Sequence, residues 1–177
     1  MISVEAQYRL MYRLGITPWD RDSVPAELTH LIEGAGALPP GLALDIGCGS
    51  GRDATYLSDH GWRVTGLDVS ARAIDAARRR SSNVDWHVGG LGAASLEPVI
   101  ERLTGQVTFV LDVGCLHGLG THGRAAWAAT VNRVAAPGAL VGTPRGIDPT
   151  MVSALLGPDW SPGSRSPKWA LHVRSKE

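Results

Sequence analysis

The sequence LALDIGCGSG, residues 42–51, is the stretch that decides the fold of this chain. Its apolar first half, 42–46, predicts a buried strand, and the glycines after it predict a tight turn that opens a helix. A second apolar stretch, 62–67, is followed at once by Asp68. A strand that ends in a glycine turn, followed by a second strand that ends in a carboxylate, can hold a nucleoside. The first half of the chain is therefore predicted to contain a cofactor site.

Strand and helix patterns alternate along the rest of the chain. We expect a helix capped by Ser70, further helices over 24–34, 53–60, 96–103, 125–134 and 149–156, and further strands over 84–88, 107–111, 139–142 and 169–173. This alternation predicts an α/β fold with a doubly wound, Rossmann-like sheet of seven mostly parallel strands. The last two strands are expected to form an antiparallel hairpin at the sheet edge. Pro137-Gly138 is expected to mark the end of a helix, and 113–120 is expected to be a loop.

The composition is typical of one ordinary domain. The 177 residues are 44% hydrophobic, so we expect a single domain over 1–177, in which 1–36 forms an N-terminal helical lid segment. Basic and acidic residues balance at 17 each, and no block of one sign follows a phosphate backbone, so nucleic acid is not an expected partner. No stretch approaches the roughly 20 apolar residues of a membrane span, so no membrane partner is expected. Two cysteines without a disulfide framework favour a cytoplasmic location.

Each glycine of the turn has its own expected purpose. Gly47 and Gly49 are expected to take positive φ and to let backbone N–H groups approach a ligand. Gly51 is expected to permit close contact between helix and strand. A nicotinamide dinucleotide fingerprint needs its third glycine where this chain has Arg52, so that alternative is disfavoured.

Two segments, DIGCGSG at 45–51 and VTGLDVS at 64–70, resemble the first and second motifs of class I S-adenosylmethionine-dependent methyltransferases. The resemblance implies that the glycine turn lies under the methionine part of the cofactor. It also implies that Asp45 helps to hold the ammonium group, and that Asp68 accepts both ribose hydroxyls. A carboxylate suits the latter role because it has two acceptor oxygens.

The adenine end of the expected site departs from the family pattern. The family often has an acidic residue after its third strand, but this chain reads WHVGGL at 86–91. Adenine is therefore expected to rely on backbone groups near Gly90 and Leu91. The residues expected to bind S-adenosylmethionine, and its product S-adenosylhomocysteine, are Trp19, Asp45, Gly47, Cys48, Gly49, Gly51, Asp68, Val69, Gly90, Leu91 and Asp112.

The methyl acceptor is expected beyond the strand at 107–111, because ligands of open parallel sheets lie past the carboxyl ends of the strands. The loop there, DVGCLHGLGTH at 112–122, resembles the small-molecule branch of thiopurine, thiol, halide and tellurite-resistance methyltransferases. The Trp19-Asp20 pair resembles the N-terminal segment that folds over the cofactor in that branch. The chain lacks an Asn/Asp-Pro-Pro-Tyr/Phe tetrapeptide, which disfavours amide and DNA substrates.

The catalytic candidates depend on the acceptor. A thiolate or halide needs no base, whereas an alcohol or phenol does, and a positioned histidine can take that proton. His117 is the first candidate for this catalytic role and Asp112 the second, although either His117 or His122 can instead have a structural role. The residues expected to bind substrate are Tyr12, His117, His122 and Arg145, the last through an anionic group of the acceptor. A metal site is not expected, because Cys115, His117 and His122 lie in one loop with no fourth ligand suggested.

The aromatic residues before the first strand leave two interpretations open. Tyr8, Tyr12 and Trp19 are spaced like one face of a helix followed by a turn, which suits either core packing or a lid over donor and acceptor. The expected function is methyl transfer from S-adenosylmethionine to a small molecule, of the thiol, thiopurine or halide type. The alternatives are an O-methyltransferase with His117 as base and a non-catalytic protein that binds S-adenosylmethionine. A homodimer is one way to complete an acceptor site in so short a chain.

Overall fold

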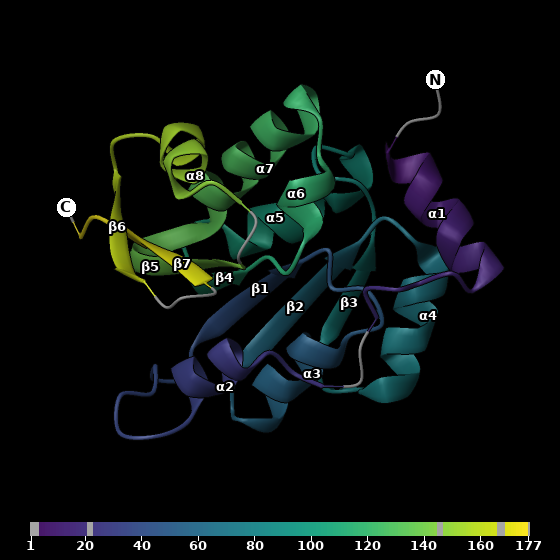
Figure 1. Cartoon of the computed structure of the whole chain (residues 1–177), viewed down its shortest axis with the longest axis horizontal. Helices are drawn as coiled ribbons and strands as arrows, with labels where there is room; N and C mark the ends of the chain where they lie inside the picture. Colours follow the sequence, from purple (N-terminus) through teal and green to yellow (C-terminus); the bar gives the residue numbers. More distant parts are fainter. Residues whose placement is uncertain (1–3, 21–22, 145–146, 166–168, 177) are drawn as a thin grey trace.

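The computed structural model describes residues 4–20, 23–144, 147–165 and 169–176. Within these residues a seven-stranded sheet has the order β3-β2-β1-β4-β5-β7-β6 (Figure 1). The strands are β1 Leu42–Ile46, β2 Arg63–Asp68, β3 Asp85–Val88, β4 Val107–Leu111, β5 Ala135–Pro144, β6 Trp160–Arg165 and β7 Trp169–Arg174. The first five pair in parallel, and β7 runs antiparallel to both β5 and β6. The doubly wound sheet with an antiparallel edge hairpin is confirmed.

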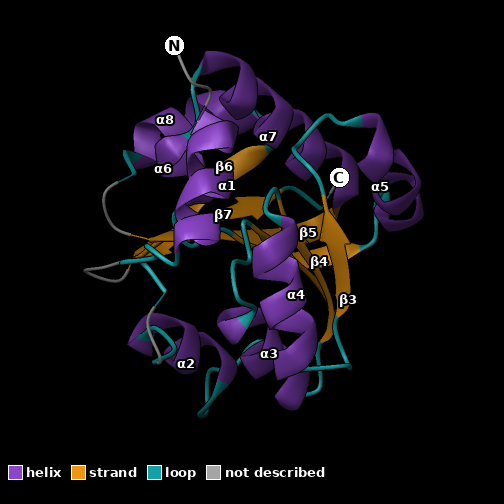
Figure 2. Ribbon diagram, turned by 90° about the vertical axis from the view of Figure 1, so that its right-hand side faces the viewer, coloured by secondary structure: helices purple, strands orange, loops and turns teal. Residues whose placement is uncertain are grey.

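Helices cover both faces of this sheet, as Figure 2 shows for α7 and α8 on one side and α2 and α3 on the other. The helices are α1 Val4–Leu14, α2 Ala26–Ile32, α3 Arg52–Asp59, α4 Ala71–Arg80, α5 Glu97–Leu103, α6 Cys115–Gly118, α7 Thr121–Val134 and α8 Pro149–Leu156, with a short 3-10 turn, η1, at Ala94–Leu96. The expected cap of α4 is confirmed, since the Ala73 N–H donates to Ser70 Oγ at 3.3 Å.

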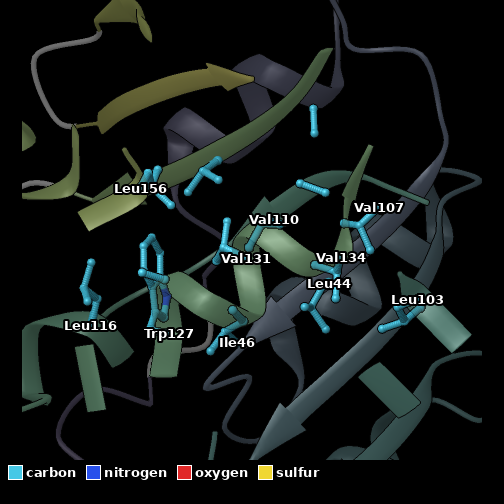
Figure 3. Close-up of a cluster of buried hydrophobic side chains, with 14 of the residues drawn as sticks. Leu44, Ile46, Leu103, Val107, Val110, Leu116, Trp127, Val131, Val134 and Leu156 are labelled. Atoms are coloured by element: carbon cyan, nitrogen blue, oxygen red, sulfur yellow. The ribbon is translucent and has the colours of Figure 1, made fainter. Parts of the chain in front are cut away.

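Alternation along β1 supplies the two halves of the core. Leu44 and Ile46 belong to a cluster with α5, α7 and α8, around the fully buried Trp127 (Figure 3). Ala43 faces the other cluster, which α2, α3 and α4 cover. Because both faces of β1 are buried, the strand reads as a nearly continuous apolar run. Asp45 is the exception to that run.

Three boundaries differ from the sequence prediction. Pro137-Gly138 does not end a helix but lies inside β5, where the pairing with β4 shifts register between Val107 and Phe109. This irregularity accommodates the positive φ of Gly138, 77°, and the lack of a backbone N–H at Pro137. The loop expected over 113–120 contains α6, and α7 begins at Thr121, ahead of the expected 125.

The topology places one region for ligand binding. β1 lies between β2 and β4, so the chain reverses its winding direction there, and the loops after these strands meet at one end of the sheet. The helix α1 lies against α4, with Arg9 Nε donating to the Val69 carbonyl and an Arg72 nitrogen donating to the Arg13 carbonyl, both at 3.2 Å. In the part of the chain that is described, no helix has the length and apolar character to cross a bilayer.

Candidate active site

The glycine turn after β1 is held tightly against β2. The N–H groups of Gly47 and Cys48 both donate to the Leu67 carbonyl, at 2.8 and 3.0 Å. Gly47 has φ of 75° and Gly49 has φ of 55°, so the expected positive φ values are confirmed. A Cβ atom at Gly49 would lie 2.8 Å from the Tyr12 hydroxyl oxygen. Gly49 is therefore needed both for the positive φ of the turn and for the close approach of the Tyr12 side chain.

Gly51 is a packing residue. It starts α3 with φ of 82°, and a Cβ there would lie 2.5 Å from the Trp86 ring and 2.8 Å from Ala77 Cβ. The expected close contact is present, but Gly51 does not line the cavity. Its assignment to the cofactor-binding residues stays a prediction, and its missing side chain makes room for β3 and α4.

Asp68 ends β2 and holds the glycine turn from the side. One carboxylate oxygen accepts the Gly49 N–H at 3.0 Å, and the other accepts the Ser70 N–H at 2.8 Å. Burial raises the pKa of this carboxyl group, and the two N–H donors oppose the rise. Each oxygen keeps a second lone pair, so the carboxylate can still accept hydrogen bonds from a ligand. Its binding of ribose remains a prediction.

Asp45 is the least satisfied polar group of the site. Its side chain is 2% exposed, and among the described residues its Oδ2 atom has no hydrogen-bond partner. Burial raises its pKa well above the usual range, and the charge of Asp53 adds to the effect. A buried carboxylate oxygen without a partner is costly. At the wall of a cavity it is a place where a ligand cation gains a strong partner.

These groups surround a cavity of about 640 Å³ at the carboxyl ends of β1, β2 and β4. Of the residues predicted to bind cofactor or substrate, those that line it are Tyr12, Trp19, Asp45, Gly47, Cys48, Gly49, Asp68, Val69, Gly90, Leu91 and His117. Asp20, of the Trp19-Asp20 pair, and Asp53 also line it, and no motif in the sequence singles out Asp53. The Ser50 hydroxyl donates to Asp20 at 2.7 Å, and Arg52 pairs with Asp53 through two contacts of 2.7 Å.

Known proteins are similar to this chain in sequence and in fold. A family profile described as "Methyltransferase domain" matches residues 43–138, which is more than half of the chain. The chain belongs to the methyltransferase domain family. S-adenosylmethionine, not a nicotinamide dinucleotide, is therefore the cofactor of this domain.

Individual relatives match shorter segments. The chain is 36% identical over 73 residues to "Probable thiol methyltransferase 2" of Arabidopsis thaliana, covering 41% of this chain and 32% of the relative. It is 43% identical over 87 residues to "Ribosomal RNA small subunit methyltransferase C" of Alcanivorax borkumensis, covering 49% and 27%. The chain thus spans less than a third of either relative. A solved structure of the 1,6-didemethyltoxoflavin-N1-methyltransferase of Burkholderia thailandensis, with S-adenosylhomocysteine bound, shares the fold with a TM-score of 0.74 at 17% identity, covering 97% of this chain and 87% of that one.

The residues of this methyltransferase domain fit its cofactor. The unpartnered Asp45 oxygen suits an ammonium group, and Asp68 keeps acceptor capacity at the end of the neighbouring strand. Gly89, Gly90 and Leu91, after β3, line the cavity with backbone and an apolar side chain. Adenine binding through this segment remains a prediction.

Aromatic side chains from the N-terminal segment close one side of the cavity. The Trp19 Nε1 atom donates to the Tyr12 hydroxyl at 3.2 Å, and the Trp19 ring meets the rings of Tyr8 and Tyr12 edge-on, with centroids 5.2 and 5.8 Å apart. All three residues line the cavity, and none belongs to the two core clusters. The three side chains thus lie where a lid over the cavity would place them, and their role as a lid stays a prediction.

Asp112 of this methyltransferase domain does not reach the cavity. It is fully buried, and its carboxylate accepts the Cys115 N–H at 2.9 Å, the Leu116 N–H at 3.0 Å and the Trp127 Nε1–H at 2.8 Å. Burial raises its pKa to about 7, and these donors oppose the rise. The predicted roles of Asp112 as a base and as a cofactor-binding residue stay predictions, which its burial among groups of its own chain does not favour. Its observed contacts fix the start of α6 against α7.

The two histidines of the acceptor loop have different positions. His117 is exposed on α6 and lines the cavity. His122 is exposed in the first turn of α7 and is not among the lining residues, so its predicted contact with substrate is not supported. Arg145 lies outside the described residues.

Proposed function

We propose that this chain transfers the methyl group of S-adenosylmethionine to a small-molecule acceptor, with a thiol or another soft sulfur acceptor favoured. The observation that carries the proposal is the buried, unpartnered oxygen of Asp45 in a cavity that Asp68 also lines. Two carboxylates at adjacent strand ends suit a ligand with an ammonium group at one point and a diol at another. When bound, S-adenosylmethionine supplies a methyl group on a positively charged sulfur.

The chain's own residues would orient the partners. Asp45 would accept from the ammonium group, and Asp68, fixed by the Gly49 and Ser70 N–H groups, would accept from the ribose. Trp19 and Tyr12 would exclude water from the reacting atoms. Alignment and water exclusion are most of what an in-line displacement needs.

A sulfur acceptor is favoured because the cavity offers few candidates for a general base. Asp112 is fully buried among its own chain's donors, and His122 is not among the residues that line the cavity. A thiol that ionises near neutral pH reacts without such a group. The name of the Arabidopsis relative, a probable thiol methyltransferase, supports the same choice.

The test is a transfer assay with labelled methyl donor against thiols, halides, phenols, sugars and ribosomal RNA. We expect methylated thiols, and we expect S-adenosylhomocysteine to bind by isothermal titration. RNA is included because the Alcanivorax relative is named for ribosomal RNA. Binding of S-adenosylhomocysteine with no methylation of any acceptor would support the non-catalytic alternative, and methylation of RNA alone would overturn the small-molecule proposal.

An O-methyltransferase is a second candidate because His117 lines the cavity. A base at this position contributes roughly 10²- to 10⁴-fold to the rate with a neutral hydroxyl acceptor. Under this alternative, His117→Ala abolishes methylation of phenols or sugars. Under the thiol proposal, the same variant changes thiol methylation little once the thiolate is formed.

A further inference from the structure

Two tyrosines on α1 contact the loops after two different strands. Tyr8 and Tyr12 lie one helical turn apart, so their side chains share a face of α1. A Cβ at Gly49, after β1, would lie 2.8 Å from the Tyr12 hydroxyl. A Cβ at Gly118, at the end of α6, would lie 3.0 Å from the Tyr8 hydroxyl and 3.3 Å from its Cε2 atom. The helix therefore spans the cavity from one loop to the other.

The two loops belong to different halves of the site. Gly49 adjoins Asp68, so Tyr12 lies over the half expected to hold the methyl donor. Gly118 ends α6, which follows β4 and presents His117 to the cavity. Tyr8 therefore lies over the half expected to hold the acceptor. The sequence predicts Tyr12 as the substrate-binding tyrosine, whereas the geometry favours Tyr8.

The walls of the acceptor half are apolar and aromatic. The residues that line this half come from α1, the turn after it, and the segments after β4 and β5. They include Tyr8, Trp19, Val113, Cys115, Leu119 and Ile147. Burial raises the pKa of Tyr8, as do the charges of Cys115, Asp68 and Asp112, so its hydroxyl stays neutral and remains a hydrogen-bond donor.

The carboxylates that the structure places on the cavity wall belong to the half expected to hold the methyl donor. Among the described lining residues the carboxylates are Asp20, Asp45, Asp53 and Asp68, and the one side chain with a permanent positive charge, Arg52, is paired with Asp53. A halide has no carbon surface with which to contact the apolar and aromatic walls of the acceptor half. A thiol with an apolar group gains that contact through its carbon atoms, and it reacts as the thiolate that it forms near neutral pH.

We propose that Tyr8 is a specificity-determining residue, whose ring forms with α6 a wall that selects a thiol carrying an apolar group over a small acceptor without carbon surface, such as a halide. The inference rests on the proposed function, since it assigns the acceptor of that same site. Tyr8 acts by contact and shape, and no proton transfer is assigned to it.

The test measures binding of thioanisole, the S-methyl product of thiophenol, to protein saturated with S-adenosylhomocysteine. For Tyr8→Ala we expect the thioanisole Kd to rise about tenfold, while the S-adenosylhomocysteine Kd changes by less than about twofold. Tyr8→Phe keeps the ring and is expected to stay near the wild type. Gly118→Ala keeps Tyr8 but crowds its hydroxyl, so its thioanisole Kd is expected to rise as well. Leu10→Ala is the matched control, because Leu10 is an exposed residue of the same helix and is expected to change neither Kd.

A parallel assay compares methylation of thiophenol with that of iodide. We expect wild type to prefer thiophenol and Tyr8→Ala to lose about tenfold of that preference. An unchanged thioanisole Kd in Tyr8→Ala, an equal rise in both Kd values, or a wild-type preference for iodide would each overturn the inference. Absence of methylation with every acceptor would overturn the proposed function instead, and binding that depends on Tyr8 would still be visible with thioanisole.

Discussion

At the residue scale, the buried Asp45 makes cofactor binding dependent on pH. Its pKa is raised well above the usual range by burial and by Asp53, so in the free protein it holds a proton at pH values where carboxyl groups are ordinarily ionised. A ligand ammonium group favours the ionised form, so binding must release that proton. We therefore expect affinity for S-adenosylhomocysteine to rise with pH until the pKa of the free carboxyl group is passed. Titrations in buffers of different ionisation enthalpy should show up to one proton released.

Asp45→Asn provides the comparison. The amide cannot ionise, so we expect weaker binding and no proton release. Asp59→Asn is the control, because Asp59 is exposed at the end of α3 and does not line the cavity. Equal pH profiles for wild type and Asp45→Asn would show that Asp45 does not hold the ligand cation.

Asp112 leads to a prediction about stability. Asp112→Asn places an amide nitrogen where only acceptors fit, which leaves the N–H of Cys115 or the indole N–H of Trp127 without its acceptor. We expect a loss of about 1–3 kcal/mol in the free energy of unfolding by urea titration.

The effect should depend on pH. The pKa of the Asp112 carboxyl group is about 7 in the folded protein and lower in the unfolded chain, so the folded wild type binds an extra proton between about pH 4 and pH 7. The contribution of Asp112 to the unfolding free energy of the wild type therefore falls as pH rises through that window. The difference in unfolding free energy between wild type and Asp112→Asn should narrow over the same range.

Local motifs predicted some site residues well and others poorly. The positive φ of Gly47 and Gly49 follows from the turn itself, so spacing alone is sufficient to predict it. The role of Asp112 depends on Trp127, which α7 brings against it from a separate element. The choice between Tyr8 and Tyr12 likewise depends on where α1 lies over the two loops. Such contacts between distant elements have no signature in the sequence.

At the element scale, the junction of β1 and α3 depends on Gly51. Gly51→Ala would add left-handed backbone strain at φ of 82° and a Cβ 2.5 Å from the Trp86 ring. We expect a loss of about 2–4 kcal/mol in unfolding free energy, from strain of about 1–2 kcal/mol plus the packing conflict. Gly105→Ala is a close match, since Gly105 has φ of 69° and an added Cβ would have no neighbour within 4 Å. If the two variants lose equal stability in urea, the contact with Trp86 is not what requires glycine.

The bounds of elements were predictable where the apolar pattern is continuous. The strands Leu42–Ile46 and Val107–Leu111 and the helix Pro149–Leu156 lie where the sequence places them. β5 does not, because Pro137-Gly138 reads locally as a break, while the strand pairs with β4 on both sides of it, at Ala135 and from Leu140 onward. Tertiary pairing overrides local turn chemistry in that strand.

At the scale of the whole molecule, the alternation of elements predicts a mostly parallel sheet with helices on both faces, because parallel strands need crossover connections. It does not predict how the N-terminal segment lies. The expected lid over 1–36 divides in the structure: Leu28 and Ile32 of α2 belong to a core cluster, whereas no residue of α1 belongs to either cluster. We therefore propose that the lid is confined to α1 and the turn that carries Trp19.

Removal of residues 1–20 tests this division. Both core clusters lie outside that segment, so we expect the shortened protein to unfold cooperatively, with a urea midpoint close to that of the full chain. It loses the Trp19 and Tyr12 walls and the hydrogen bond of Asp20 to Ser50, so the Kd for S-adenosylhomocysteine should rise about tenfold, or about 1.4 kcal/mol. Loss of cooperative unfolding would place α1 in the structural core, and an unchanged Kd would show that α1 does not cover the cofactor. Because α2 stays in place and closes one face of the sheet, removal of residues 1–36 should instead abolish cooperative folding.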